Sequence, residues 1–210
     1  MRTLDRDAQQ ALTPQCALDI LKEGNKRFIN NLKANRNLLQ QANETVEGQY
    51  PFVIVLSCID SRTSVELIFD QGLGDVFSVR VAGNIINDDI LGSMEFACKL
   101  AGSKLIVVLG HSHCGAVKGA CGDAKLEHLT GLLDKIKPAI ESAQDGSEEL
   151  SHDDFVQRVA DANVQVAVDQ IMQKSKTLKE MIENGEIGIV GGMHDIKSGR
   201  VEFFSGIGAE

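Results

Sequence analysis

Two short segments of this 210-residue sequence carry the side chains best suited to chemistry. Cys58, Asp60 and Arg62 alternate in the first segment, and His111 and Cys114 lie three residues apart in the second. Thiolates and imidazoles are the ligands that zinc prefers, and a catalytic zinc site uses three of them with one position open to water. Cys58, His111 and Cys114 supply such a set. The sequence therefore predicts a Cys₂His zinc site.

Other interpretations of these residues remain open. A cysteine that follows a strand is commonly a core residue, and one H-x-x-C pair is a weak signal. A structural zinc site would be closed by a fourth ligand, for which His113 is the nearby candidate. Binding by both His111 and His113 would strain a loop that already holds Cys114, so we favour three ligands.

Asp60 and Arg62 also allow two interpretations. On a surface, such an ion pair stabilises a protein by about 0–1 kcal/mol. Beside a metal, Arg62 can hold the carboxylate through two hydrogen bonds. Asp60 can then accept a hydrogen bond from metal-bound water and orient it.

The other cysteines are interpreted as packing residues. Cys16 and Cys98 lie on apolar faces of expected helices and should be buried, and Cys121 follows Cys114 by two helical turns. Five cysteines without a C-x-x-C pair fit a reducing compartment better than a set of disulfides. Residues 1–10 are polar and lack the apolar segment of a secretory signal, which favours a cytoplasmic protein, although a processed N-terminus would leave the same sequence.

Strands and helices alternate along the chain, which predicts an α/β fold with a mostly parallel β-sheet flanked by helices. Apolar runs indicate strands at 52–56, 76–81, 105–109 and 187–190 and an edge strand at 201–204, and helical periodicity covers 14–34, 88–101, 126–140 and 153–183. We expect an N-terminal helical arm over 1–50, ending in a polar stretch at 35–49, and a catalytic domain over 51–210, as one domain overall. Both reactive segments follow strands, where ligands gather in such sheets.

Composition argues against two classes of partner. The net charge of −9 disfavours nucleic-acid binding, which needs a surplus of Lys and Arg. No run approaches the roughly 20 apolar residues of a membrane span. Residues 110–115 have the glycine spacing of a phosphate loop, but Ala116 stands where the lysine of that motif belongs.

Taken together, Cys58-x-Asp60-x-Arg62 and His111-x-x-Cys114-Gly115 resemble the signature of the β-carbonic anhydrases, plant-like branch. Segments 17–28, 77–84 and 191–195 are similar to further parts of that family. The resemblance implies reversible hydration of carbon dioxide to bicarbonate and a proton by zinc-bound hydroxide. It implies that Cys58, His111 and Cys114 bind Zn²⁺ and that the Asp60–Arg62 dyad orients the nucleophile. It assigns substrate contacts to Gln49, Phe77 and the backbone of Gly115.

The resemblance also implies a homodimer or homotetramer with active sites at the subunit interface. Phe96 and His194 stand where tyrosines are common in the family, so those hydroxyls are absent. The allosteric branch uses a tryptophan in a bicarbonate pocket, and this chain has none. We therefore expect an always-open site with water as the fourth zinc ligand.

Two alternative functions share these residues. Hydrolases of carbon disulfide or carbonyl sulfide have the same zinc signature, and a non-catalytic zinc-stabilised module would need only the ligands. The Asp60–Arg62 pair and Gln49 argue against the module, because a structural site has no use for a nucleophile-orienting dyad.

Overall fold

One mixed β-sheet organises the chain, for which the computed structural model describes residues 3–144, 150–204 and 206. Its strands lie in the order β2-β1-β3-β4-β5. The first four strands are parallel, and β5 runs antiparallel to β4 at the edge. The strands are β1 (Val53–Ser57), β2 (Val76–Arg80), β3 (Leu105–His111), β4 (Gly188–His194) and β5 (Val201–Phe203). The predicted fold class is thus confirmed.

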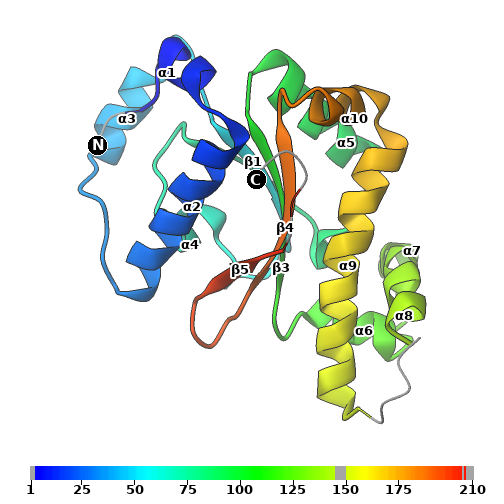
Figure 1. Ribbon diagram of the computed structural model, residues 1–210. Coiled ribbons are helices and arrows are strands. Elements are labelled where there is room, and N and C mark those ends of the chain that lie inside the picture. Colours follow the sequence, from blue (N-terminus) through cyan, green and yellow to red (C-terminus); the bar gives the residue numbers. More distant parts are fainter. Residues whose placement is uncertain (1–2, 145–149, 205, 207–210) are drawn as a thin grey trace.

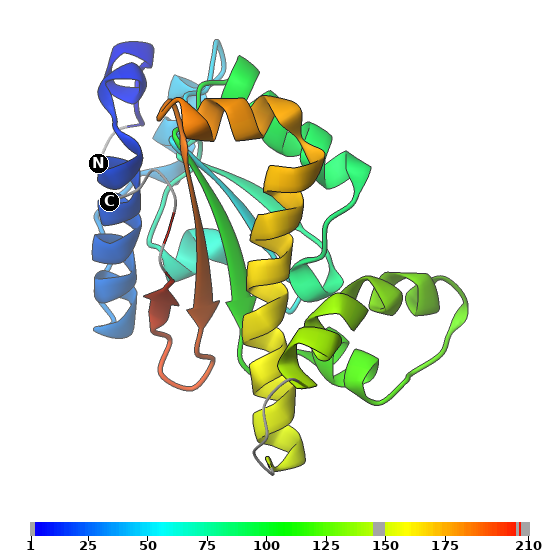
Figure 2. The same cartoon turned by 45° about the vertical axis from the view of Figure 1, so that its right-hand side comes forward.

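Helices cover both faces of the sheet (Figures 1 and 2). The N-terminal group packs on one face and consists of α1 (Arg6–Ala11), α2 (Pro14–Ile29), α3 (Leu38–Glu44) and α4 (Val65–Ile68). On the other face lie α5 (Asp88–Glu95), continued by one π-helical turn at Phe96–Leu100, α9 (His152–Lys174) and α10 (Lys176–Glu183). Beyond the carboxyl ends of the strands lie α6 (Gly115–Cys121), α7 (Glu127–Leu133), a 3₁₀ turn at Asp134–Ile136 and α8 (Lys137–Gln144).

Buried strands separate two hydrophobic cores. All residues of β1 and β3 are buried, and alternate side chains point to opposite faces. Val53 and Val55 join the core under α2 and α4, whereas Ile54 and Leu56 join the core under α5, α9 and α10. A third cluster lies around the carboxyl ends of β1 and β3 and includes Cys58 and Cys114.

Polar contacts of Arg27, Arg36 and Asn25 help to hold the N-terminal arm to the rest of the chain. Asp70 accepts hydrogen bonds from the side chains of Arg27 and Arg36, the latter at 2.7 Å. Asn25 donates to the carbonyl of Gly199 at 2.9 Å and accepts from the amide of Val201 at 2.9 Å. Asn25 thereby satisfies the carbonyl of Gly199, just before β5, and the amide of Val201 in the edge strand β5. An unpaired amide on an edge strand would be free to pair with another strand.

Several expectations about helices were wrong. The first predicted helix ends at Ile29 rather than near residue 34, and the polar stretch after it contains α3, whose first turn is capped by Asn37. The long helix predicted over 153–183 breaks at Ser175, whose hydroxyl caps α10. Cys16, expected to be buried, is exposed, because the buried face of α2 consists of Ala17, Leu18, Leu21, Gly24 and Asn25.

The burial of Cys98 is confirmed. Cys121 is partly buried and packs against the third cluster, as predicted. None of the helices among the described residues has the length and apolarity needed to cross a bilayer.

Candidate metal centre

Parallel pairing brings the two reactive segments together. β1 and β3 are parallel neighbours, with Ser57 opposite Leu109, so the carboxyl ends of the two strands lie side by side. Cys58 follows β1 directly, His111 is the last residue of β3, and Cys114 precedes the first residue of α6. The ligand atoms of these three residues lie within 4.8 Å of one another, and all three side chains are buried. The structure therefore assembles the trio that the sequence predicts.

The imidazole of His111 has one nitrogen free to bind a metal. Its Nδ1 lies 2.9 Å from the carbonyl oxygen of Ser112, which can only accept, so Nδ1 carries the proton. Nε2 is buried, has no hydrogen-bond partner and keeps its lone pair. Metal-bound histidines typically donate their second N–H to such an acceptor. A buried nitrogen without a partner is costly, and a metal ion would satisfy it.

The two thiols influence each other's ionisation. Cys58 Sγ and Cys114 Sγ are 4.0 Å apart. A hydrogen bond from Cys114, with smaller contributions from His111 and the Gly83 amide, lowers the pKa of Cys58 to about 4. The Cys58 thiolate and burial raise the pKa of Cys114. A divalent cation between the sulfurs removes this opposition, so the donor set fits Zn²⁺ with both cysteines as thiolates.

Arg62 holds Asp60 in a fixed orientation. Its Nε donates to Asp60 Oδ1 at 2.9 Å and its Nη2 to Oδ2 at 2.8 Å, while the Arg62 amide donates to Oδ1 at 3.0 Å. The hydrogen bond from the Arg62 side chain holds the pKa of Asp60 well below its usual range. Asp60 is thus a carboxylate at neutral pH, and two parallel side-chain hydrogen bonds give it a defined direction.

Two residues that the sequence analysis missed position the Cys58–Asp60 segment. Arg80, at the end of β2, donates to the carbonyls of Cys58 at 3.1 Å and Asp60 at 2.6 Å. The hydroxyl of Thr63, which is 1% exposed, lies within hydrogen-bond distance of the same two carbonyls, at 3.1 and 2.9 Å. No local sequence signal marks Arg80, because its role depends on β2 pairing with β1.

The second ligand segment is fixed from β4. The amide of Ser112 donates to the carbonyl of His194, and the Ser112 hydroxyl donates to Asp195 at 3.3 Å. His113 is exposed and has a left-handed backbone with φ of 56°. The structure does not group it with the three buried ligand atoms.

Gly115, Gln49 and Phe77 lie in different places. Gly115 directly follows Cys114, and no atom lies within 4 Å of where its Cβ would be, so its backbone is open to a small ligand. Phe77 pairs with Ile54, four residues before Cys58, which corresponds to about 13 Å along a strand. The structure therefore does not bring Phe77 to the ligand trio of the same chain.

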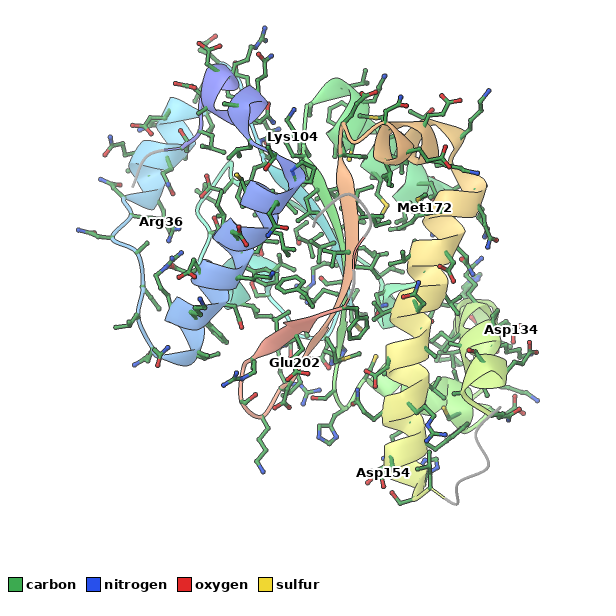
Figure 3. The ribbon with its side chains drawn as sticks, viewed as in Figure 1. Arg36, Lys104, Asp134, Asp154, Met172 and Glu202 are labelled. Carbon is green, nitrogen blue, oxygen red and sulfur yellow. The ribbon has the colours of Figure 1, made fainter. Side chains whose placement is uncertain are left out.

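Gln49 is exposed and precedes the amino end of β1, whereas Cys58 follows the carboxyl end of that strand. Gln49 precedes Pro51, whose carbonyl accepts hydrogen bonds from Gln9 and Ser103 near the amino end of β3. The carbonyl of Phe52 accepts a hydrogen bond from the amide of Lys104, which is labelled in Figure 3 and directly precedes β3, the strand that has His111 as its last residue. Phe52 is six residues, or about 20 Å, from Cys58.

Comparisons with known proteins agree on one family. A family model described as carbonic anhydrase matches residues 53–201. The curated protein carbonic anhydrase 2 of Mycobacterium tuberculosis is 36% identical over 208 residues, covering 93% of this chain and 95% of that protein.

Two solved structures extend this finding. The β-carbonic anhydrase CafA of Aspergillus fumigatus is 31% identical with a TM-score of 0.72, over 82% of this chain and 83% of that chain. A structure from a study of two tetrameric β-carbonic anhydrases of Sordaria macrospora is 26% identical with a TM-score of 0.70, over 79% of this chain and 86% of that chain.

Proposed function

This chain belongs to the β-carbonic anhydrase family and is a carbonic anhydrase, and from that premise we propose that it binds Zn²⁺ through Cys58, His111 and Cys114 and interconverts carbon dioxide and bicarbonate. The observation that carries the proposal is the convergence of two buried thiols and an unpartnered imidazole nitrogen within 4.8 Å, beside a carboxylate held by an arginine. Zinc, when bound, would supply Lewis acidity and acidify a water ligand.

The residues of the chain then have separate tasks. Asp60 accepts a hydrogen bond from the attacking water and sets the direction of the oxygen lone pair that faces carbon dioxide. Arg62 keeps Asp60 ionised and turned toward that water. The backbone at Gly115, which is open on its Cα side, lies beside the ligands and contacts a substrate oxygen.

We propose that the site is open, with Asp60 remaining on Arg62 rather than binding zinc. Three hydrogen bonds from Arg62 occupy both carboxylate oxygens and would have to be given up for Asp60 to become a fourth ligand. A crystal structure of the zinc protein at pH 7 tests this arrangement. A bond between Asp60 and zinc would contradict it.

We further propose that Gln49 and Phe77 serve the metal centre of a partner subunit in a homodimer or homotetramer. Both lie toward the amino end of β1 and β2, away from their own ligand trio. The expected substrate contacts are possible only if two chains are arranged so that these residues of one reach the other. The tetrameric relatives from Sordaria macrospora support such an assembly.

Carbonyl sulfide is the competing substrate, because the same ligands and dyad could hydrolyse it. The test is a comparison of the rates of carbon dioxide hydration and carbonyl sulfide hydrolysis by the zinc-loaded protein. Carbon dioxide should be the much faster substrate. A faster reaction with carbonyl sulfide, or no reaction with either when zinc is bound, would overturn the proposal.

A further inference from the structure

A buried asparagine far along the chain is connected to one predicted metal ligand through the backbone of a single residue, Gly83. Asn163 lies on α9, is 3% exposed, and donates from Nδ2 to the carbonyl of Gly83 at 2.8 Å. The amide of Gly83 in turn points to Cys58 Sγ at 3.4 Å. The carbonyl and the amide of one residue are thus tied to Asn163 on one side and to a predicted zinc ligand on the other.

The turn that contains Gly83 permits little adjustment. Gly83 has φ of +70°, a conformation that favours glycine, within a 3₁₀ turn at Ala82–Asn84. A Cβ at this position would lie 2.8 Å from Ile136 and 3.3 Å from Ala116. Because the crowded turn leaves φ and ψ of Gly83 little freedom, a contact that holds its carbonyl also holds the direction of its N–H.

The bond from Asn163 has no structural explanation in the packing of α9 alone. α9 packs against β3 and β4 mainly through apolar residues such as Val164 and Ile171. An asparagine at this buried position loses its hydration, which is tolerated only where its polar atoms find partners. The hydrogen bond to the Gly83 carbonyl supplies such a partner for the Asn163 amide.

We propose that Asn163 is a positioning residue for the metal centre: by holding the Gly83 carbonyl, it steadies the backbone of Gly83 and so directs the Gly83 N–H onto the Cys58 sulfur, which pre-orients this ligand and moderates its electron donation to the metal. The inference rests on the proposed zinc site and adds to it a residue 105 positions from Cys58 along the chain. Outer hydrogen bonds of this kind orient ligands, and their loss typically weakens metal binding by about 10–100-fold.

Two variants test the proposal on the full-length protein. Asn163→Ala removes the donor, and Asn163→Asp keeps the shape of the side chain but presents only acceptors to the Gly83 carbonyl. Ile171→Val, two turns later on α9 and also buried, is the matched control for a small packing loss on the same helix.

The first measurement is zinc affinity by competition with a chromophoric chelator. Asn163→Ala and Asn163→Asp should bind zinc at least about tenfold more weakly than wild type. Ile171→Val should bind like wild type.

In the cobalt-substituted proteins, both Asn163 variants should move the thiolate-to-cobalt charge-transfer band to longer wavelength, because the sulfur loses a hydrogen bond and donates more strongly. A purely structural role for Asn163 would leave this band unmoved in folded, metal-loaded protein.

A second measurement needs no variant. In wild-type protein loaded with cadmium-113, the amide proton of Gly83 should show scalar coupling to the metal through the Cys58 sulfur, and absence of this coupling would overturn the proposal. Asn163 variants that match wild type in affinity and in cobalt spectrum would overturn it as well. Wild-type protein that binds no metal would overturn both this inference and the proposed function, and is recognised from the wild-type measurements alone.

Discussion

The position of Gln49 leads to a quantitative prediction about how two chains share each site. Gln49 lies beyond Phe52, which is about 20 Å from Cys58 of the same chain. If Gln49 serves the partner's metal centre, a Gln49 lesion in one chain and a Cys58 lesion in the other damage the same site of a mixed dimer. One site of that dimer then carries both lesions, and the other carries none.

The expected recovery follows from random pairing. We consider Cys58→Ser, which removes a metal ligand, and Gln49→Ala, which removes a hydrogen-bond donor expected to cost about 10²-fold in rate. When both variants are co-expressed in equal amounts, a site has an intact ligand set in about half of cases. Independently, it has an intact partner Gln49 in about half. About one quarter of all sites should therefore be fully functional in an assembly of symmetric pairs.

The assay is carbon dioxide hydration by each variant alone and by the co-expressed mixture, with zinc content measured for each sample. Each variant alone should be nearly inactive, and the mixture should recover about a quarter of the wild-type rate. Cys58→Ser co-expressed with Asp60→Asn is the matched control, since both residues belong to one ligand edge and every site of that mixture keeps a lesion. Equal, near-zero rates in both mixtures would refute the assignment of Gln49 to the partner's site.

Three further predictions concern the dyad and the fold. Asp60→Asn should lower kcat/KM for carbon dioxide by about 10²-fold or more while zinc content stays at the wild-type level. Arg62→Lys should not replace the two parallel hydrogen bonds that Arg62 donates to Asp60. Unchanged kinetics in Asp60→Asn would contradict the role of the Asp60–Arg62 dyad. Gly24→Ala should lower the free energy of unfolding by about 2–4 kcal/mol in urea titrations, because the new Cβ would lie 1.8 Å from the carbonyl oxygen of Phe69. A loss below about 0.5 kcal/mol would show that α2 can shift away from Phe69. Burial raises the pKa of Asp75, so the contribution of this carboxyl to stability is lost as the pH rises above about 3.8 through its folded-state pKa. Asp75→Asn lacks this loss, so its stability relative to wild type should be higher at pH 7 than at pH 3. The opposite order in urea titrations would contradict the assignment.

The grouping of Cys58, His111 and Cys114 was predictable because its signals are local. Continuous apolar runs placed Cys58 and His111 at the ends of two strands, and the carboxyl ends of parallel strands lie on the same side of a sheet. The residue types of the trio then indicated zinc without knowledge of any long-range contact.

The residues that support the ligands were not predictable in this way. Arg80, Thr63 and Asn163 act on backbone carbonyls, which have no sequence signature. The pairing of β2 with β1 and the packing of α9 across the sheet bring them to the site. Their side chains alone would suit a surface or a helix face equally well.

The errors in the helical arm have a similar cause. The apolar spacing that suggested a helix to residue 34 includes Phe28 and Leu32, but both side chains are substantially exposed. The chain leaves the helix after Ile29, and Arg36 then binds Asp70 from the connection between β1 and β2. A long-range ion pair therefore determines the path of a segment whose own sequence shows no periodicity.

The most direct test of the account is carbon dioxide hydration by stopped flow during titration of the metal-free protein with zinc. The rate should rise in proportion to bound zinc, level off at one ion per chain, and increase with pH across the ionisation of the bound water. Stoichiometric zinc binding by Cys58, His111 and Cys114 without hydration of carbon dioxide at any pH between about 6.5 and 9 would contradict the central claim.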